Sequence, residues 1–413
     1  MKTRNFLDEP VRDYFHGGLI LLAFALFAKG TLVHYPVFLM MLLGIAFIWK
    51  KPDLECYAAL KIVLLMYFSV WFPMVIATID AENLRRAVKT ALLYLHFFPV
   101  LVYLIVVGRR KRIRRLVTYG LVALILFGAV DALVQLTLGK DFFGYPYSHG
   151  LLTGVFHPKQ RIGLFCAALV PLVLYVSQSR DAGKNMQLVI VSLLFVVILL
   201  SLKRSAWLMG LVAVAGYLLV FRKTEWFSFK RVICAVAIFL FVVGIAFSLS
   251  KPLQKQIHNS FITPFSESSE IDQASSYRLS LWRTAQKMVS EHWINGIGPR
   301  GYRYLYPEYA SKDDFWMRKG EGGQTHPHWL LLEVAVETGI VGLLSLILFY
   351  IVFFRVLTSP ELDSPGRAFV LSAGVAWFPF NMHLAFYGSY WTTFVWLLLG
   401  LGVAGYQTKE KTS

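Results

Sequence analysis

A few arginines and histidines in this chain have the chemistry of a group-transfer site. Arg204 and Arg278 each carry a planar guanidinium, which suits the paired oxygens of a phosphate. His326 and His328 flank Pro327, and a neutral imidazole can accept a proton near pH 7, as a general base does. These residue types would supply an anion clamp and a base.

The same residues also have purely structural interpretations. Arg204 lies between two apolar stretches, where basic residues commonly extend from a helix end to the membrane interface. Arg278 lies on a predicted helix at 275–289, where it could be a solvated charge. Glu333 and Glu337 follow inside an apolar stretch, where a carboxylate is costly and normally has a partner. That partner could be an arginine, a histidine or a neighbouring helix.

The elements that must position these residues are long apolar stretches. The chain has 413 residues, of which 57% are hydrophobic and only 16% are charged, whereas soluble domains are about 25% charged. Apolar stretches of about 18 residues or more recur along it, which is typical of a polytopic helical membrane protein. We therefore expect an all-α membrane protein of about twelve spans, at residues 14–29, 33–49, 57–77, 90–107, 116–138, 160–178, 186–202, 205–221, 232–250, 328–354, 367–385 and 389–406.

The distribution of Lys and Arg predicts the orientation of these spans. With the N-terminus inside, the short loops hold 21 Lys and Arg on the cytoplasmic side and 9 on the other. Both termini are then cytoplasmic, and residues 251–327 form one large outside loop between two membrane regions, 1–250 and 328–413. The net charge of +17 is explained by the cytoplasmic loops, so nucleic acid is not an expected partner.

Three predicted outside segments hold more basic and aromatic residues than a simple connection between helices requires. They are 140–161, 201–207 and 251–327. In the last, we expect a helix at 275–289 with Ser275 or Ser276 as its N-cap and an apolar stripe on one face. The glycines and proline at 296–301 form a turn whose backbone can approach a ligand closely. The tyrosines that follow suit either sugar stacking or an interfacial aromatic belt, and the belt is the simpler interpretation.

The sequence carries no pattern of a cofactor or metal site. Cys56, Cys166 and Cys234 lack any Cys-x-x-Cys or Cys/His spacing. The 296–301 turn is not a nucleotide phosphate loop, because no strand precedes it and no Gly-Lys-Ser/Thr follows. We expect neither a cofactor nor a metal.

The order and spacing of these motifs resemble those of the O-antigen ligase family. The matching segments are the His-Trp pair at 328–329 with its nine-residue spacer and Gly-Ile-Val-Gly at 339–342, the Arg-Ser-Ala-Trp turn at 204–207, the segment at 277–282 and the segments 154–163 and 296–302. Trp329 departs from the family pattern, which usually has Asn, Ser or Gln there. If the polar residue of the family contacts the ligand, that contact is replaced here by tryptophan.

The resemblance implies a glycosyltransferase of the bacterial inner membrane with a periplasmic active site. Its partners would be an O-antigen polysaccharide on undecaprenyl pyrophosphate, a lipid A–core acceptor and membrane lipids. His328 would deprotonate the acceptor hydroxyl, and Arg204 and Arg278 would stabilise the departing diphosphate in an inverting reaction that needs no metal or nucleotide. The further substrate-binding candidates are Lys159, Arg161, Arg300, Arg303 and His326.

Two other functions fit part of the pattern. An O-antigen polymerase would use a similar donor with a lipid-linked glycan as acceptor, but the His-x9-Gly-x-x-Gly spacing favours the ligase. A transporter or flippase of lipid-linked glycans usually has ionisable residues near the bilayer midplane and inverted repeats. Here the charges concentrate in the outside loop and no repeat is visible, so transfer is the favoured function.

Overall fold

The computed structural model describes most of the chain. It covers residues 9–51, 56–148, 150–179, 184–221, 275–318, 320, 322–382 and 384–407, and isolated positions between 244 and 272. The predicted span at 232–250 and the first part of the predicted loop, up to residue 274, lie outside these continuous ranges.

Within the described ranges the chain is all-helical apart from three isolated β-bridges. The elements used below are α1 (Glu9–Leu26), η1 (Phe27–Val33), α2 (His34–Trp49), α3 (Tyr57–Ile76), α4 (Leu84–Tyr94), α5 (Phe97–Gly108), α6 (Lys111–Leu138), η3 (Gly154–Phe156), α7 (Ile162–Ser179), α8 (Lys184–Leu200), α9 (Arg204–Val220), α13 (Arg278–Glu291), α14 (Tyr302–Tyr309), α15 (Phe315–Arg318), α16 (Leu330–Thr358), α17 (Ser364–Ala376) and α18 (Ser389–Val403).

Several helical stretches have the length and composition needed to cross a membrane. Among the described residues there are five, Glu9–Trp49, Tyr57–Ile76, Leu84–Gly108, Lys111–Leu138 and Leu330–Thr358. Shorter apolar helices are Ile162–Gln178, Val189–Leu200, Arg204–Val220 and Ser389–Val403. The predicted fold class, an all-α membrane protein, is thus confirmed in outline, and the number of twelve spans stays a prediction.

The predicted span at 90–107 is two helices rather than one. Helix α4 begins after Asn83, whose side chain accepts a hydrogen bond from the backbone N–H of Arg86 at 3.0 Å, as an N-cap does. It ends at Tyr94, and α5 begins at Phe97. The polar first turns of α4 thereby form a separate short helix ahead of the apolar α5.

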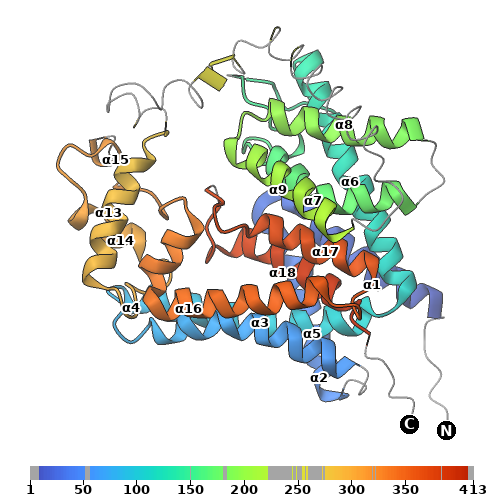
Figure 1. Cartoon of the computed structure of the whole chain (residues 1–413), viewed down its shortest axis with the longest axis horizontal. Coiled ribbons are helices and arrows are strands. Elements are labelled where there is room, and N and C mark those ends of the chain that lie inside the picture. Colours follow the sequence, from blue (N-terminus) through green and yellow to red (C-terminus); the bar gives the residue numbers. More distant parts are fainter. Residues whose placement is uncertain are drawn as a thin grey trace.

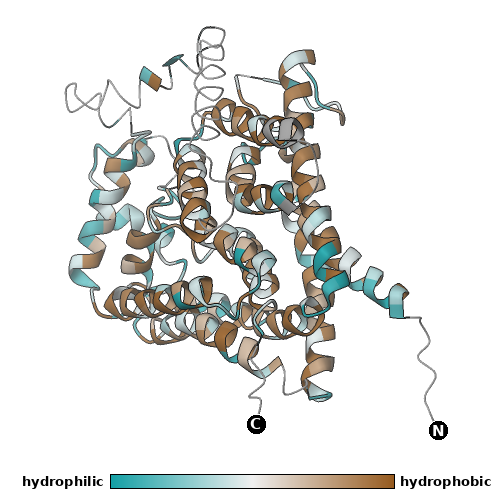
Figure 2. Cartoon of the chain, turned by 45° about the vertical axis from the view of Figure 1, so that its right-hand side comes forward, coloured by the Kyte–Doolittle hydropathy of each residue, from teal (hydrophilic) through white to brown (hydrophobic). Residues whose placement is uncertain are grey.

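The helices pack around an aromatic core. Helix α3 runs beside α16, α2 beside α5, and α17 beside α18 (Figure 1). Trp377, Trp391 and Trp396 are fully buried between them, and their size makes them large contributors to the packing. Two of their indole N–H groups are satisfied, by the carbonyl of Ala376 at 3.0 Å and the hydroxyl of Tyr94 at 2.9 Å. Figure 2 shows that hydrophobic residues dominate most of these helices.

A second, smaller core lies over the first half of α16. It is built from the buried faces of α13 and α14 and includes Leu281, Ala285, Met288, Ile297, Tyr302, Leu305, Tyr306 and Val336. The predicted helix at 275–289 is therefore confirmed, with its apolar stripe packed against protein. The predicted N-cap at Ser275 or Ser276 is wrong, because α13 begins at Arg278 and its N-cap residue is Tyr277, which makes no side-chain cap hydrogen bond. The Ser275 hydroxyl still accepts a hydrogen bond from Arg278 N at 3.1 Å, just ahead of the helix.

Candidate functional site

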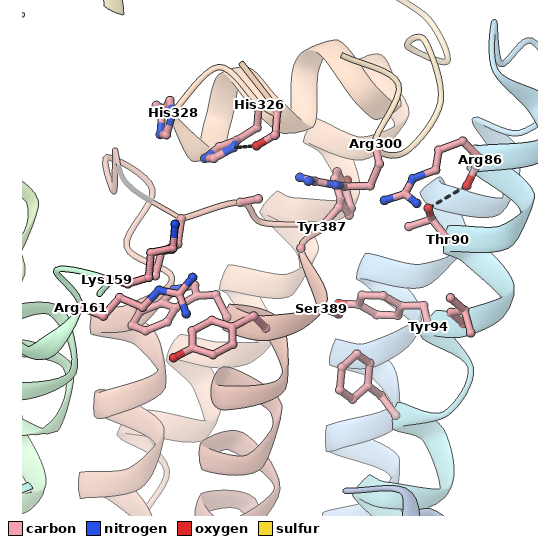
Figure 3. Close-up of a pocket in the computed structure, with 18 of the residues that line it drawn as sticks. Arg86, Thr90, Tyr94, Lys159, Arg161, Arg300, His326, His328, Tyr387 and Ser389 are labelled. Atoms are coloured by element: carbon pink, nitrogen blue, oxygen red, sulfur yellow. Dashed lines mark hydrogen bonds between the residues drawn. The ribbon is translucent and has the colours of Figure 1, made fainter. Parts of the chain in front are cut away.

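A pocket of about 710 Å³ lies at one end of the helices (Figure 3). It is lined by residues from α4, from the segment before α7, from the turn before α9, from the 296–301 and 325–328 turns, and from the start of α18. All of these segments lie at or beside the predicted outside loops. The pocket therefore gathers polar residues that are far apart in the sequence.

The two histidines lie on the turn that leads into α16. His328 has a left-handed backbone with φ of 55°, and the rings of His326 and His328 are 4.0 Å apart between centroids. His326 is buried and its Nδ1 is 2.9 Å from the hydroxyl of Thr325. The indole N–H of Trp282 on α13 donates to the carbonyl of Pro327 at 3.0 Å, and this bond holds the turn to α13. Both histidines line the pocket, and their functional role stays a prediction.

Three basic residues line one side of the pocket. Lys159 and Arg161 precede α7, and Lys203 precedes α9. The guanidinium of Arg161 lies over the ring of Tyr390 at 4.0 Å from its centroid, a cation–π contact. The segments meet closely because Gly163 has no side chain: a Cβ there would come within 2.2 Å of the Ser201 hydroxyl.

The predicted clamp residues Arg204 and Arg278 lie next to this basic side rather than in the lining. Arg204 donates from Nη2 to the hydroxyl of Ser276 at 3.3 Å, so the turn before α9 meets the start of α13. Burial, and then the nearby charge of Arg204, lowers the pKa of Arg278 to about 10, so it stays protonated at neutral pH. Burial, and then Arg278, also lowers the pKa of Lys203. The structure thus brings the two arginines together and places them near Lys203, which lines the pocket.

Arg300 lines the opposite side of the pocket and is held by two buried glutamates of α16. Glu337 accepts a hydrogen bond from the Arg300 backbone N–H at 2.6 Å, and Glu333 Oε1 lies 3.9 Å from Arg300 Nη1. Glu333 also accepts from the backbone N–H groups of Phe386 and Tyr387 at 3.0 and 3.2 Å. The sequence did not decide which groups pair with Glu333 and Glu337. In the structure these partners are Arg300 and backbone N–H groups.

Arg303 lies near Arg300 but is not part of the pocket lining. It is the second residue of α14 and is half-buried. Its pKa is lowered by burial first, and then by the positive charges of Arg300 and Arg86. The three guanidiniums therefore form one neighbourhood of positive charge.

Arg86 and Lys89 of α4 line the pocket and were not among the predicted site residues. A signal was present, because these residues belong to a basic group on the side of the membrane where basic residues are few. In α4 they alternate with the buried Ala87 and Ala91, which anchor the helix. The amphipathic pattern of α4 is thus the feature that could have identified them.

The glycines of the turn at 296–301 lie against other parts of the protein and do not face an open ligand site. A Cβ on Gly296 would lie 2.5 Å from the backbone of Glu337, and one on Gly298 would lie 2.5 Å from Ala81. Both glycines have positive φ. The turn is consequently pressed onto α16, and this contact places Arg300 at the pocket.

The tyrosines of this region do not form an interfacial belt as a group. Tyr302 and Tyr306 are fully buried in the small core, where their hydroxyls donate to the Leu281 carbonyl and to Asp314, each at 2.9 Å. Tyr304 is exposed. The belt interpretation is therefore wrong for the two buried tyrosines, because the helical spacing of α14 turns them toward α13.

Trp329, the departure from the family pattern, is not part of the pocket lining. Its ring packs near Trp282 and Phe380, at centroid distances of 5.4 and 6.5 Å. A tryptophan here contributes aromatic packing beside the histidine turn. The polar side chains of the described pocket come from other positions.

A polar residue in α6 holds the segment that carries Lys159. The Gln135 carbonyl oxygen accepts from the backbone N–H groups of Thr153 and Gly154 at 3.0 and 2.9 Å, and its amide donates to the Thr153 hydroxyl at 3.1 Å. This anchors η3 to α6, and η3 leads into the basic residues of the pocket. The 154–163 segment therefore positions the basic side chains of Lys159 and Arg161 at the pocket.

The described residues include no group of three or more His, Cys, Asp or Glu side chains that could hold a metal. The pocket offers positive charge on two sides, three imidazoles (His96, His326 and His328) and the aromatic ring of Tyr390. Such a site can bind anionic groups and move a proton.

Comparison with known proteins finds one family that is similar to part of the chain. A search of curated proteins finds no match to this chain. The family model described as O-antigen ligase matches residues 189–347, a range that includes Arg204, Arg278, Arg300, His326 and His328. The match agrees with the resemblance predicted from the motifs: over residues 189–347 this chain is similar to the O-antigen ligase family.

Proposed function

We propose that the protein transfers O-antigen polysaccharide from undecaprenyl pyrophosphate to a sugar hydroxyl of lipid A–core at the periplasmic face of the bacterial inner membrane. The observation that carries the proposal is the pocket itself, where basic residues and two histidines from distant segments meet at the ends of apolar helices. The family match is consistent with glycosyl transfer in a membrane. In this proposal the chain has about twelve spans, with both termini cytoplasmic and a periplasmic loop at 251–327.

The donor diphosphate binds at the side formed by Lys159, Arg161 and Lys203, with Arg204 and Arg278 behind them. The acceptor oxygen attacks the anomeric carbon while the bond from that carbon to the diphosphate oxygen breaks. The configuration inverts, and undecaprenyl pyrophosphate leaves with the bonding electrons. The cations stabilise the charge that develops on it, an effect that is larger in a partly dehydrated site than in water.

His328 takes the proton of the acceptor hydroxyl. It fits this role because it lies half-buried at the pocket, two residues before α16 begins. General-base assistance is typically worth roughly 10²–10⁴-fold in rate. His326 contributes to substrate binding beside it.

The test is an assay of the purified full chain with a lipid-linked glycan and lipid A–core, run with and without chelator. Glycan attached to lipid A–core, unchanged by chelator, supports the ligase. Glycan chains that lengthen on the lipid-linked carrier would instead identify a polymerase. Glycan movement across a vesicle membrane without a new covalent product would identify a flippase.

A further inference from the structure

The pocket carries more positive charge than a single diphosphate site explains. Figure 3 shows Lys159 and Arg161 on one side, Arg86 and Arg300 converging on the other, and His326 above the space between them. The two basic groups come from different elements and lie on opposite sides of the pocket. A donor diphosphate at the first group leaves the second group without a substrate role.

The second group, here called the α4 cluster, consists of Arg86, Lys89, Arg300 and Arg303. Arg300 is only 9% exposed, and its Nη1 makes no hydrogen bond among the described residues although the residue lines the pocket. The Nε atoms of Arg86 and Arg303 are likewise buried without a hydrogen-bond partner there. Buried donors of this kind are costly unless something accepts from them.

The net charge of the α4 cluster favours an anion as that acceptor. The cluster has four cationic side chains, and two buried carboxylates, Glu333 and Glu337, lie beside Arg300, so positive charge remains in excess. Glu333 accepts from the backbone N–H groups of Phe386 and Tyr387, and Glu337 Oε2 accepts from that of Arg300, while Glu337 Oε1 has no hydrogen-bond partner among the described residues. Guanidiniums that converge in this way match the oxygens of a phosphate.

We propose that the α4 cluster binds a phosphate group carried by the acceptor substrate, at a site separate from the donor diphosphate. The inference rests on the proposed function, because it assigns the second side of the same pocket to the second substrate. A phosphate anchored there would hold the acceptor glycan below His326 and His328. The cluster would then select phosphorylated acceptors.

The experiment compares lipid A–core with the same preparation after phosphatase treatment, using the purified full chain. The variants are Arg86→Ala and Arg300→Gly. Glycine suits position 300 because the backbone there has φ of 64°, and the N–H that Glu337 accepts is kept. Arg85→Ala is the matched control, since Arg85 is exposed on α4 and does not line the pocket.

We expect wild type and Arg85→Ala to have a KM for the phosphorylated acceptor about 10-fold or more below that for the treated acceptor, the size of one hydrogen bond to a charged group. Arg86→Ala and Arg300→Gly should lose this difference while the KM of the donor stays unchanged. Equal KM values for the two acceptors in wild type would overturn the inference. So would a rise in donor KM in the variants, because the α4 cluster would then belong to the donor.

A binding measurement separates this inference from the proposed function. Native mass spectrometry of the detergent-purified chain should show preferential binding of the phosphorylated lipid, lost in Arg86→Ala and Arg300→Gly and kept in Arg85→Ala. That pattern supports the anion site even if no transfer occurs. Transfer without any phosphate preference in binding would leave the proposed function in place and overturn the anion site.

Discussion

His328 combines a left-handed backbone with the chemical role proposed for it above. Its φ of 55° lies in the left-handed region, which costs most residues about 1 kcal/mol or more. The turn is held by Trp282 through the Pro327 carbonyl, and α16 begins two residues after His328. The surrounding contacts therefore fix the ring of His328 at the pocket.

Replacement of His328 tests its role as the base. We expect His328→Asn to fold, because asparagine tolerates the left-handed backbone, and to lose transfer by roughly 10²-fold or more. His326→Asn is the comparison and should be milder, with its effect mainly on KM. Turnover of purified His328→Asn at the wild-type rate would contradict the role, and a larger loss in His326→Asn would assign the base to His326.

The arginines behind the donor side are tested through donor use. Arg204→Ala and Arg278→Ala should each lower kcat/KM for the lipid-linked donor by about 10-fold or more, since each removes a charge near the diphosphate. The kcat/KM for the acceptor, measured at saturating donor, should change less. Donor kinetics identical to those of wild type would show that Lys159, Arg161 and Lys203 suffice for the diphosphate.

At the scale of elements, α16 organises the site through its bend. Gly339 has φ of 61° inside this helix, and a Cβ there would lie 2.1 Å from the Ile294 carbonyl. The backbone N–H of Ile340 donates to the carbonyl of Trp293 at 2.8 Å. The glycine thus lets residues 293–297 dock on α16, and the turn that follows carries Arg300 to the pocket.

Gly339→Ala should therefore destabilise the protein by about 2 kcal/mol or more, because it combines an unfavourable φ with a clash against backbone. Gly18→Ala is the control, as no atom lies within 4 Å of a Cβ built there. The midpoint of thermal unfolding in detergent measures both. Equal midpoints for the two variants would contradict the docking role of Gly339.

At the scale of the whole molecule, charged residues occupy two ends with different functions. At the end opposite the pocket segments, Arg110, just before α6, pairs with Asp13 on α1 at 2.7 Å, and Arg114 on α6 pairs with Asp363 just before α17. These pairs join helices that are distant in sequence. They belong to the predicted cytoplasmic side, and the structure shows them holding helices together.

Because Arg114 lies at the end away from the pocket, we expect Arg114→Ala to lower stability and to leave substrate binding intact. Loss of one partner leaves Asp363 partly buried and unpaired, at a cost of about 2 kcal/mol, less than for a fully buried pair because Asp363 is 24% exposed. Arg112→Ala, exposed on the same helix, should be neutral. Thermal unfolding and KM values distinguish the two effects, and a raised KM in Arg114→Ala at unchanged stability would contradict this expectation.

The sequence by itself determined the membrane class, the helix that carries Arg278, and the histidines at the start of α16. Those features are local, because hydropathy, helical spacing and a glycine motif are each encoded by residues close together in the sequence. It also indicated the family, through the order of short motifs. The buried tyrosines and the contact of the glycine turn with α16 were misjudged, because the partner surface lies on another element.

Only the tertiary structure decided which charges share a pocket. Arg86 and Arg300 meet because the 296–301 turn packs against α4 through Gly298 and Ala87 and against α16 through Gly296 and Glu337, and no local pattern encodes these contacts. The same holds for Glu333 and Glu337, whose carboxylates find partners in Arg300 and in the turn before α18. Buried charge and buried amides must be satisfied wherever the packing brings them. That requirement acts through space, so the site's second basic side became visible only in the fold.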